Sequence, residues 1–281
     1  MSGDGTFDPT ISLDAPLAEQ VASLKWYHSF DLPGGVSTSG FYDHRGMAHK
    51  VPIPADLSGR RCLDVASSDG FWAFQLAQRG AAEVVSVDLD DASRQDWQGV
   101  VGPPPDAATG TGRARRAFDI VNNATGLGVK RHDMSVYDLS RDELGTFDFV
   151  FMGNVLLHLR DPQRALLAVR DVCEGQFLSF ECISLPLTLL RPFTPTGQLS
   201  DQDEPRWWTP NARAHRRLLE AAGFEVQDGK WPVLQPFGGL IARRPASLPT
   251  RPREVVFWSF VRPFGVASQW LLSRPTRDRQ G

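Results

Sequence analysis

The sequence is poor in several features that would each assign it to a different class of protein. It has three cysteines in 281 residues and no short spacing between them, which argues against a disulfide framework or a zinc site. The formal net charge is -3, so no overall field attracts nucleic acid or an anionic membrane. No uninterrupted apolar run approaches the roughly 20 residues of a membrane helix. Nucleic-acid and membrane partners are therefore disfavoured.

The chain also lacks the marks of secretion. Its first residues, MSGDGTFDPT, contain neither the basic segment nor the apolar segment of a signal peptide. Cys62, Cys173 and Cys182 all lie in apolar runs, as buried free thiols in a reducing compartment do. These features predict a cytoplasmic protein. The composition, 41% hydrophobic and 22% charged, is that of an ordinary globular chain.

Short apolar runs alternate with amphipathic helical runs from residue 59 to residue 243. This order predicts an α/β fold in which helices cover both faces of a mostly parallel sheet. The seven expected strands are RCLDVA, EVVSVDL, VKRHDM, FDFVFM, QFLSFECI, FEVQD and LIARR. The expected helices are FWAFQLAQR closed by Gly80, RARRAFDIVNNA, DPQRALLAVRDV capped by Asp161 with Pro162 at its first position, and TPNARAHRRLLEAAG capped by Thr209 with Pro210 at its first position and ended by Gly223.

The predicted organisation has three parts. Residues 1–54 form a polar tail, one helix and an aromatic-rich lid of loops, and residues 55–245 form the main domain. Residues 246–281, rich in Pro and Arg, form an extension that packs on the domain or on a second subunit, which leaves a homodimer open. The insertion VVGPPPDAATGTG is expected to be a surface loop.

Two acidic residues and a loop of small residues carry the strongest functional signal. Asp64 ends the first expected strand, and the loop Ala66–Gly70 then bends into a helix, whose free N–H groups suit a carboxylate. Asp88 ends the second strand, where an acid binds ribose hydroxyls. The turn lacks the three glycines of the G-x-G-x-x-G fingerprint, which disfavours an NAD-dependent oxidoreductase.

These segments, together with WYHSFDLPGG, SVYDL, FDFVFMGNVLLHLRDP and WWTPNARAHRRLLEAAGF, resemble the class I methyltransferases related to the bacterial tRNA wobble-uridine carboxymethyltransferase. The resemblance covers roughly residues 25–245, and it is greatest to the short stand-alone members. It implies a Rossmann-like fold with a seven-stranded sheet and the cofactor S-adenosylmethionine (SAM), with S-adenosylhomocysteine as product. It implies these cofactor-binding residues: Asp64, Ala66, Ser67, Ser68 and Gly70 in the loop, Asp88 and Leu89 at ribose and adenine, Ser135 and Val136 at the adenine edge, and Met152, Gly153 and Asn154 beneath the sulfonium.

One departure from the tRNA enzyme concerns the form of the cofactor. That enzyme uses carboxy-SAM and has a Tyr immediately before the His that follows the fourth strand, whereas this chain has Leu157 there. The segment HRGMAHKVP also lacks the Trp/Lys-rich pattern of the tRNA enzyme. We therefore expect ordinary SAM and methyl transfer.

Histidines are the first candidates for proton transfer. Methyl transfer from a sulfonium is an in-line displacement that needs alignment, and an oxygen nucleophile also needs a base with a pKa near neutrality. His158, just past the fourth strand, and His28, on the lid, are the predicted catalytic residues, with a structural role as the alternative for each. The six histidines show no metal-ligand spacing, so no metal is expected.

Aromatic residues gather outside the expected strands, where they could form a substrate pocket or a wall that stacks on a sugar. Packing of the lid on the domain is the equal alternative. The predicted substrate contacts are Trp26, Tyr27, Phe41, Tyr42, His44, Trp207 and Trp208.

These features predict a SAM-dependent O-methyltransferase that acts on a small molecule, either a sugar-containing compound or another secondary metabolite. One alternative is a tRNA wobble-uridine modifying enzyme, which would need a basic groove beside the cofactor site. Another is a non-catalytic SAM-binding protein.

Overall fold

A computed structural model describes residues 11–97, 112–200, 206–241 and 261–276. The predicted insertion falls within residues 98–111, apart from Gly112, and so lies outside the described residues together with most of the polar tail. Within the described ranges, no helix has the length and apolar character that crossing a membrane requires.

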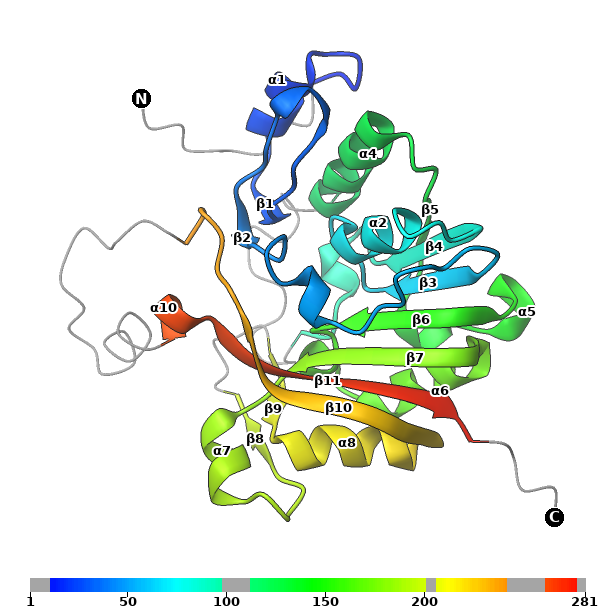
Figure 1. Ribbon diagram of the computed structural model, residues 1–281, viewed down its shortest axis with the longest axis vertical. Coiled ribbons are helices and arrows are strands. Elements are labelled where there is room, and N and C mark those ends of the chain that lie inside the picture. The colour runs from blue at the N-terminus through cyan, green and yellow to red at the C-terminus, as the bar shows by residue number, and fades with distance from the viewer. Residues whose placement is uncertain (1–10, 98–111, 201–205, 242–260, 277–281) are drawn as a thin grey trace.

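A seven-stranded sheet forms the centre of the molecule (Figure 1). Its spatial order is β10-β11-β7-β6-β3-β4-β5. Of these strands, β11 alone runs in the direction opposite to the other six, so the predicted α/β fold with a mostly parallel sheet is confirmed. The strands are β3 (Arg61–Val65), β4 (Glu83–Asp88), β5 (Lys130–Asp133), β6 (Phe147–Gly153), β7 (Cys173–Cys182), β10 (Phe224–Gln235) and β11 (Val266–Pro275).

The last strand is a correction to the sequence interpretation. Leu240 and Ile241, the described part of the expected strand LIARR, lie in a turn, and residues 266–275 of the expected extension form β11 instead. β11 lies between β7 and β10, and its two serines and its glutamine are buried with partners inside the fold, such as Ser273 Oγ, which donates to the carbonyl of Phe177. A strand that buries serine and glutamine does not show the apolar run expected of a sheet interior.

Helices cover both faces of the sheet. On one face, α2 (Phe71–Ala77) and α4 (Arg113–Thr125) pack against alternate strand residues such as Cys62, Val84 and Phe151. On the other face, α6 (Pro162–Val172), α8 (Ala212–Ala221) and the short α5 (Arg141–Leu144) pack against Leu63, Val85 and Val150. The side-chain period of two along each strand creates these two cores. The remaining short helices are α1 (Leu17–Ala22), α7 (Leu185–Leu190) and α10 (Arg262–Phe264).

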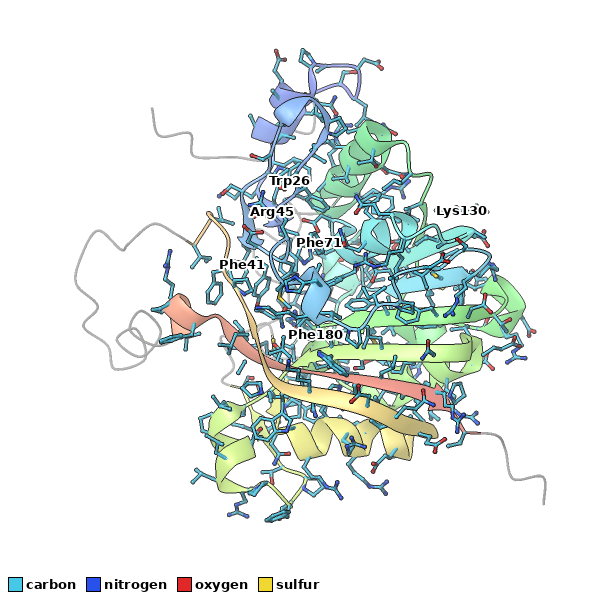
Figure 2. All side chains as sticks on the ribbon, viewed as in Figure 1. Trp26, Phe41, Arg45, Phe71, Lys130 and Phe180 are labelled. Carbon is cyan, nitrogen blue, oxygen red and sulfur yellow. The ribbon has the colours of Figure 1, made fainter. Side chains whose placement is uncertain are left out.

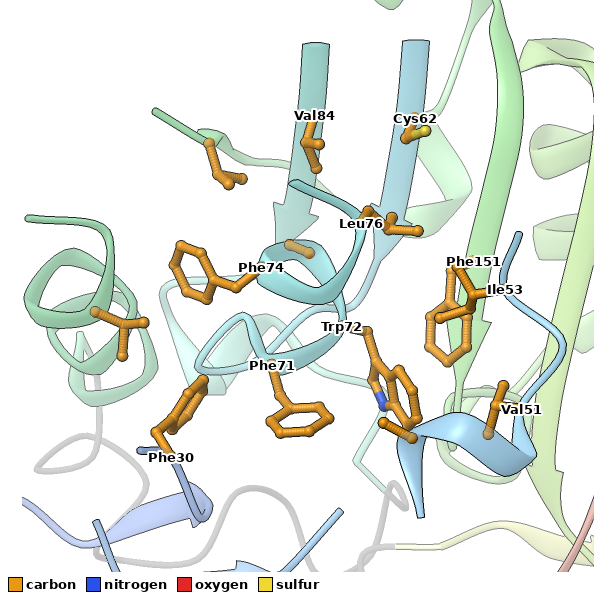
Figure 3. Close-up of a cluster of buried hydrophobic side chains, with 14 of the residues drawn as sticks. Phe30, Val51, Ile53, Cys62, Phe71, Trp72, Phe74, Leu76, Val84 and Phe151 are labelled. Carbon is orange, nitrogen blue, oxygen red and sulfur yellow. The ribbon is translucent and has the colours of Figure 1, made fainter. Parts of the chain in front are cut away.

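Aromatic packing fixes α2 against the sheet. The indole of Trp72 stacks on the ring of Phe151 with centroids 4.7 Å apart, and Phe71 and Phe74 extend the same buried cluster (Figure 3). Stacked aromatic pairs add about 0.5–1.5 kcal/mol to the free energy of burial. The start of α2, which follows the small-residue loop, is therefore rigidly placed.

The helix caps agree with the sequence in one case and correct it in another. Asp161 accepts a hydrogen bond from the backbone N–H of Arg164 with Pro162 at the first helical position, as predicted. The predicted cap at Thr209 is wrong, because Trp208–Pro210 forms strand β9 beside β8 (Gly197–Leu199), and Asn211 caps α8. Asn is as good a cap as Thr, so the sequence pattern could not separate the two.

The segment from residue 26 to residue 54, which we call the lid, is more regular than the predicted loops. It contains β1 (Trp26–His28) and β2 (Gly40–Tyr42), which pair in parallel, and the 3-10 turns η1 (Pro33–Gly35) and η2 (Ala48–Lys50). Three-residue strands give too little periodicity to be recognised in a sequence. The lid lies at the carboxyl ends of the parallel strands (Figure 1), the edge where α/β folds bind ligands.

Candidate active site

The loop between β3 and α2 has an unusual backbone. Ala66, Ser68 and Gly70 adopt positive φ values of 55°, 52° and 86°, so the left-handed conformation recurs at the small positions predicted from the sequence. This conformation is uncommon for residues other than glycine and is held only where the surrounding structure enforces it. The backbone therefore makes a tight bend that exposes main-chain groups ahead of α2.

Asp88 lies beside this loop. One of its carboxylate oxygens accepts a hydrogen bond from the backbone N–H of Ser68 at 2.5 Å, and the other accepts from Leu89 N–H at 2.7 Å. Burial raises the pKa of Asp88, and the guanidinium of Arg131 opposes that shift. The predicted pair, a loop and an acid at the tip of the second strand, is thus in direct contact.

Asp64 is buried beneath the loop at the end of β3. Its carboxylate accepts a hydrogen bond from the backbone N–H of Ala73, while Oδ2 makes no hydrogen bond within the described residues. Burial raises the pKa of Asp64 well above its usual value. A buried carboxylate oxygen without a partner fits the ammonium of an amino-acid ligand, because a positive charge would offset its desolvation.

The residues predicted at the adenine edge follow β5, and those predicted at the sulfonium lie at the end of β6; β3 and β4 separate these two strands in the sheet. Ser135 accepts a hydrogen bond from Tyr137 N–H at the start of η4 (Val136–Asp138), and Val136 is buried. Met152 is buried in the core, so only its backbone can face a ligand. Asn154 has φ 56°, and its amide exchanges two hydrogen bonds with the amide of Gln235, at 2.9 and 3.0 Å.

A single carboxylate joins the lid to the loop Ala66–Gly70. Asp69, between Ser68 and Gly70, accepts hydrogen bonds from the backbone N–H groups of Tyr27 and His28, and its Oδ1 lies 2.5 Å from His28 Nδ1. Both His28 and Asp69 are buried. His28, a predicted catalytic residue, is therefore held against the loop through one ring nitrogen.

The other predicted histidines lie apart from each other. His158 ends the turn η5 (Leu156–His158) after β6 and is partly exposed. His44 is fully buried among the rings of His28, Tyr42, Phe71 and Trp72. Burial lowers the pKa of His44 well below its usual value, so it is neutral. Within the described residues, no group of three or more His, Cys, Asp or Glu side chains could hold a metal ion.

The predicted aromatic wall divides into three places. Tyr27, Phe41 and Tyr42 do meet, and Phe237, which the sequence interpretation missed, stacks on Tyr42 at 5.8 Å. Figure 2 shows Phe41 and Phe71 on the lid side of the molecule, opposite Lys130 at the start of β5. Tyr27 contacts both Phe41 and Tyr42, and its pKa is raised by burial and by the nearby groups Cys182, Asp69, Glu181 and Asp88.

The three tryptophans do not join this cluster, so the predicted aromatic residues do not form one group. Trp26 is buried in the core and donates from Nε1 to the carbonyl of Val21. Trp207 donates from Nε1 to the carbonyl of Asp96 at 2.6 Å. Trp208 belongs to β9, beside Leu199 of β8.

Besides Asp69, two ionisable residues of the site were missed from the sequence. Glu181, at the end of β7, is 1% exposed, and its oxygens accept hydrogen bonds from the backbone N–H groups of Val155 and Leu156. Arg131, in β5, buries a guanidinium beside the cofactor loop. A charged residue inside an expected strand was the available signal for both, since such residues are seldom buried without a partner.

Comparisons with known proteins were made against this geometry. The family model described as a methyltransferase domain matches residues 42–228. The chain is 26% identical over 176 residues to the tRNA U34 carboxymethyltransferase of Pseudomonas syringae pv. tomato, which covers 62% of this chain and 48% of that protein. It is 25% identical over 187 residues to the ubiquinone biosynthesis O-methyltransferase of Neisseria meningitidis serogroup C, which covers 63% of this chain and 68% of that protein.

The fold is also similar to solved structures. The N-terminal domain of EvdMO1 with SAH bound gives a TM-score of 0.51 at 17% identity, covering 92% of this chain and 94% of that one. This identity supports the fold alone. The chain spans about half the length of the tRNA relatives that it matches. Residues 42–228 are more than half of the chain, so it belongs to the methyltransferase domain family and has the class I methyltransferase fold.

Proposed function

We propose that this protein is a SAM-dependent methyltransferase that methylates an oxygen of a small molecule. The observation that carries the proposal is the contact between Asp88 and the left-handed loop Ala66–Gly70. A carboxylate at the tip of the second strand suits ribose hydroxyls, and the loop followed by α2 suits the carboxylate of the methionine part. When bound, SAM supplies an electrophilic methyl group on its sulfonium.

The chain's own residues would align the acceptor and move a proton. In this proposal Asp64 pairs with the amino group of the cofactor, and the backbone of Met152, Gly153 and Asn154 lies beneath the sulfonium. His158, on the partly exposed turn after β6, removes the acceptor proton. His28, bound to Asp69, orients the lid. Tyr27 keeps its proton because its pKa is raised, so it donates a hydrogen bond rather than acting as a base.

The charge around Tyr27 favours ordinary SAM over carboxy-SAM. The nearby Asp69, Asp88 and Glu181 are acidic groups, and a second carboxylate on the transferred group would be repelled by those that are ionised. Leu157, at the position of the tyrosine in the tRNA enzyme, is buried and apolar. Tyr27 and Phe41 of the aromatic cluster are partly exposed, so in this proposal their rings contact a sugar or another ring. These features support a neutral small molecule as the acceptor.

A turnover assay separates this function from its alternatives. Radiolabelled SAM is incubated with the protein and either hydroxylated and glycosylated small molecules or bulk tRNA. Label on a small molecule supports the proposal. Label on tRNA, or salt-dependent tRNA binding, supports the tRNA function to which the U34 relatives point. Tight SAM binding without turnover on either acceptor would leave the non-catalytic alternative.

Asp88→Ala tests the cofactor site directly. The substitution removes a charged hydrogen-bond acceptor for the ribose, so SAM affinity should fall about 10- to 150-fold, the equivalent of about 1.5–3 kcal/mol. Titration calorimetry on folded protein measures it. Glu225→Ala, which removes an exposed carboxylate on β10, is the control and should leave affinity unchanged. Equal affinity for Asp88→Ala and wild type would refute the ribose assignment.

A further inference from the structure

Arg131 is a buried cation in β5, the strand at one edge of the sheet. It belongs to β5, yet its side chain is 1% exposed. Its guanidinium lies over the ring of Phe118 of α4, 5.2 Å from the ring centroid. A buried guanidinium is costly unless all of its donors are used, so its partners show what the structure gains from it.

One edge of the guanidinium holds the cofactor loop. Nη1 donates to the backbone carbonyl of Ser68 at 2.7 Å and to the hydroxyl of Ser67 at 3.1 Å. Ser68 is one of the two non-glycine residues that the loop keeps at positive φ. A charge-assisted bond to its carbonyl supports this strained backbone, because rotation of the peptide would break the bond.

The other edge faces the acids that follow β4. Nε and Nη2 donate to Asp90 Oδ1 at 3.2 and 3.0 Å, and Nη2 lies 3.9 Å from Asp88 Oδ2. The same Asp88 oxygen accepts from Ser68 N–H. Arg131, Ser68 and Asp88 thus form a closed set of contacts, in which the cation touches both the loop and the acid. The charged or titratable groups around Asp88 are Arg131 of β5, Asp90 after β4, Asp64 of β3 and Tyr27 of β1.

We propose that Arg131 is a positioning residue of the cofactor site, which fixes the loop Ala66–Gly70 and holds the Asp88 carboxylate in place for the cofactor. The inference rests on the proposed function. Arg131 acts through Asp88 and the loop, and it does not touch the reacting atoms. Burial raises the pKa of Asp88, and the Arg131 guanidinium opposes this rise more than any other group does. Without the cation, Asp88 would take up a proton closer to neutral pH and would lose strength as an acceptor.

Arg131→Met provides the test, with affinity for S-adenosylhomocysteine measured by calorimetry at about pH 6, 7 and 8. The quantity compared is the ratio of the variant's dissociation constant to that of wild type at each pH, which cancels titration of the ligand. We expect a ratio of about ten or more at the lowest pH that falls as pH rises, because Asp88 ionises again. A residue that only stabilised the fold would give one constant ratio.

Three further variants make the result specific. In an Asp88→Asn background, Arg131→Met should cause much less than its tenfold effect and no pH dependence, because the titrating group is gone. Arg131→Lys keeps the charge and serves if Arg131→Met does not fold; its ratio should exceed one but stay constant with pH. Arg94→Met, which removes the exposed partner of Asp133, is the matched control with a ratio near one.

The outcomes separate the inference from the function on which it rests. If wild type binds S-adenosylhomocysteine but Arg131→Met gives a ratio of one, the positioning role is overturned and the proposed function survives. A raised ratio that does not change with pH would overturn the action through Asp88 and leave only the contact with the loop. Full additivity of Arg131→Met and Asp88→Asn would overturn it as well. If wild type binds neither SAM nor S-adenosylhomocysteine, the proposed function fails and the inference fails with it.

Discussion

The folding stability of the Glu181→Gln variant is expected to fall much less with rising pH than the folding stability of wild type. Burial raises the pKa of Glu181 from its ordinary 4.5 to about 8. Between these values the folded chain keeps a proton that the unfolded chain has released. The stabilising contribution of Glu181 is therefore complete below about pH 4.5 and is lost progressively up to about pH 8. The loss amounts to about 3–5 kcal/mol.

Urea unfolding at about pH 5 and about pH 9 measures this difference. At the lower pH the variant should be less stable than wild type by about 1–3 kcal/mol, because a glutamine amide can accept only one of the two backbone hydrogen bonds from Val155 and Leu156. At the higher pH the difference in folding stability between the variant and wild type should become smaller or change sign. Glu174→Gln, in the same strand but with its side chain 57% exposed, is the control and should follow the wild-type pH profile. Parallel profiles for Glu181→Gln and wild type would show that the carboxyl ionises normally.

Gly70→Ala is expected to destabilise the protein by about 2–5 kcal/mol and to abolish SAM binding at ordinary concentrations. Gly70 has φ 86°, and a Cβ there would lie 2.6 Å from the Phe118 ring and 2.7 Å from the Phe74 ring. Left-handed backbone costs about 1–2 kcal/mol for a residue with a Cβ. Overpacking of the two buried rings adds about 1–3 kcal/mol. Both terms act on the loop that leads into α2.

The control isolates the contact from the backbone conformation. Gly126, at the end of α4, also has a positive φ of 65°, but a Cβ there would meet no atom within 4 Å. Gly126→Ala should therefore cost only about 1–2 kcal/mol. Chemical denaturation compares the two variants, and calorimetry follows SAM binding. Equal costs for the two substitutions would mean that the rings move aside and that the loop is not held by their packing.

The cofactor loop shows how far local reading of the sequence reaches. Small residues at positions 66, 68 and 70, followed by an amphipathic helix, indicate a tight bend, and the structure has positive φ at each of them. The acid at the end of β4 was placed correctly because the carboxyl ends of adjacent parallel strands must lie at one edge. Both features depend on spacing along the chain, which the sequence displays.

Arg131 and β11 show where that reading stops. A buried arginine is stabilised by carboxylates and carbonyls that lie elsewhere in the chain, here Asp90 and Ser68. The residues next to Arg131 in the sequence therefore do not reveal its partners. The serines and the glutamine of β11 resemble surface residues in the sequence, but the structure buries them because β11 is an interior strand between β7 and β10. For the same reason the lid could not be derived, because its short strands are held by Asp69 of a distant loop.

The amino-acid sequence by itself determined the α/β order, the cofactor loop and the acid opposite it, because each follows from the period of apolar residues and the spacing of small and acidic ones. Tertiary structure alone decided which strand closes the sheet, which aromatic rings share a surface, and which buried charges compensate one another. Those outcomes depend on desolvation and on contacts between residues far apart in the chain, and neither quantity is a property of a local segment.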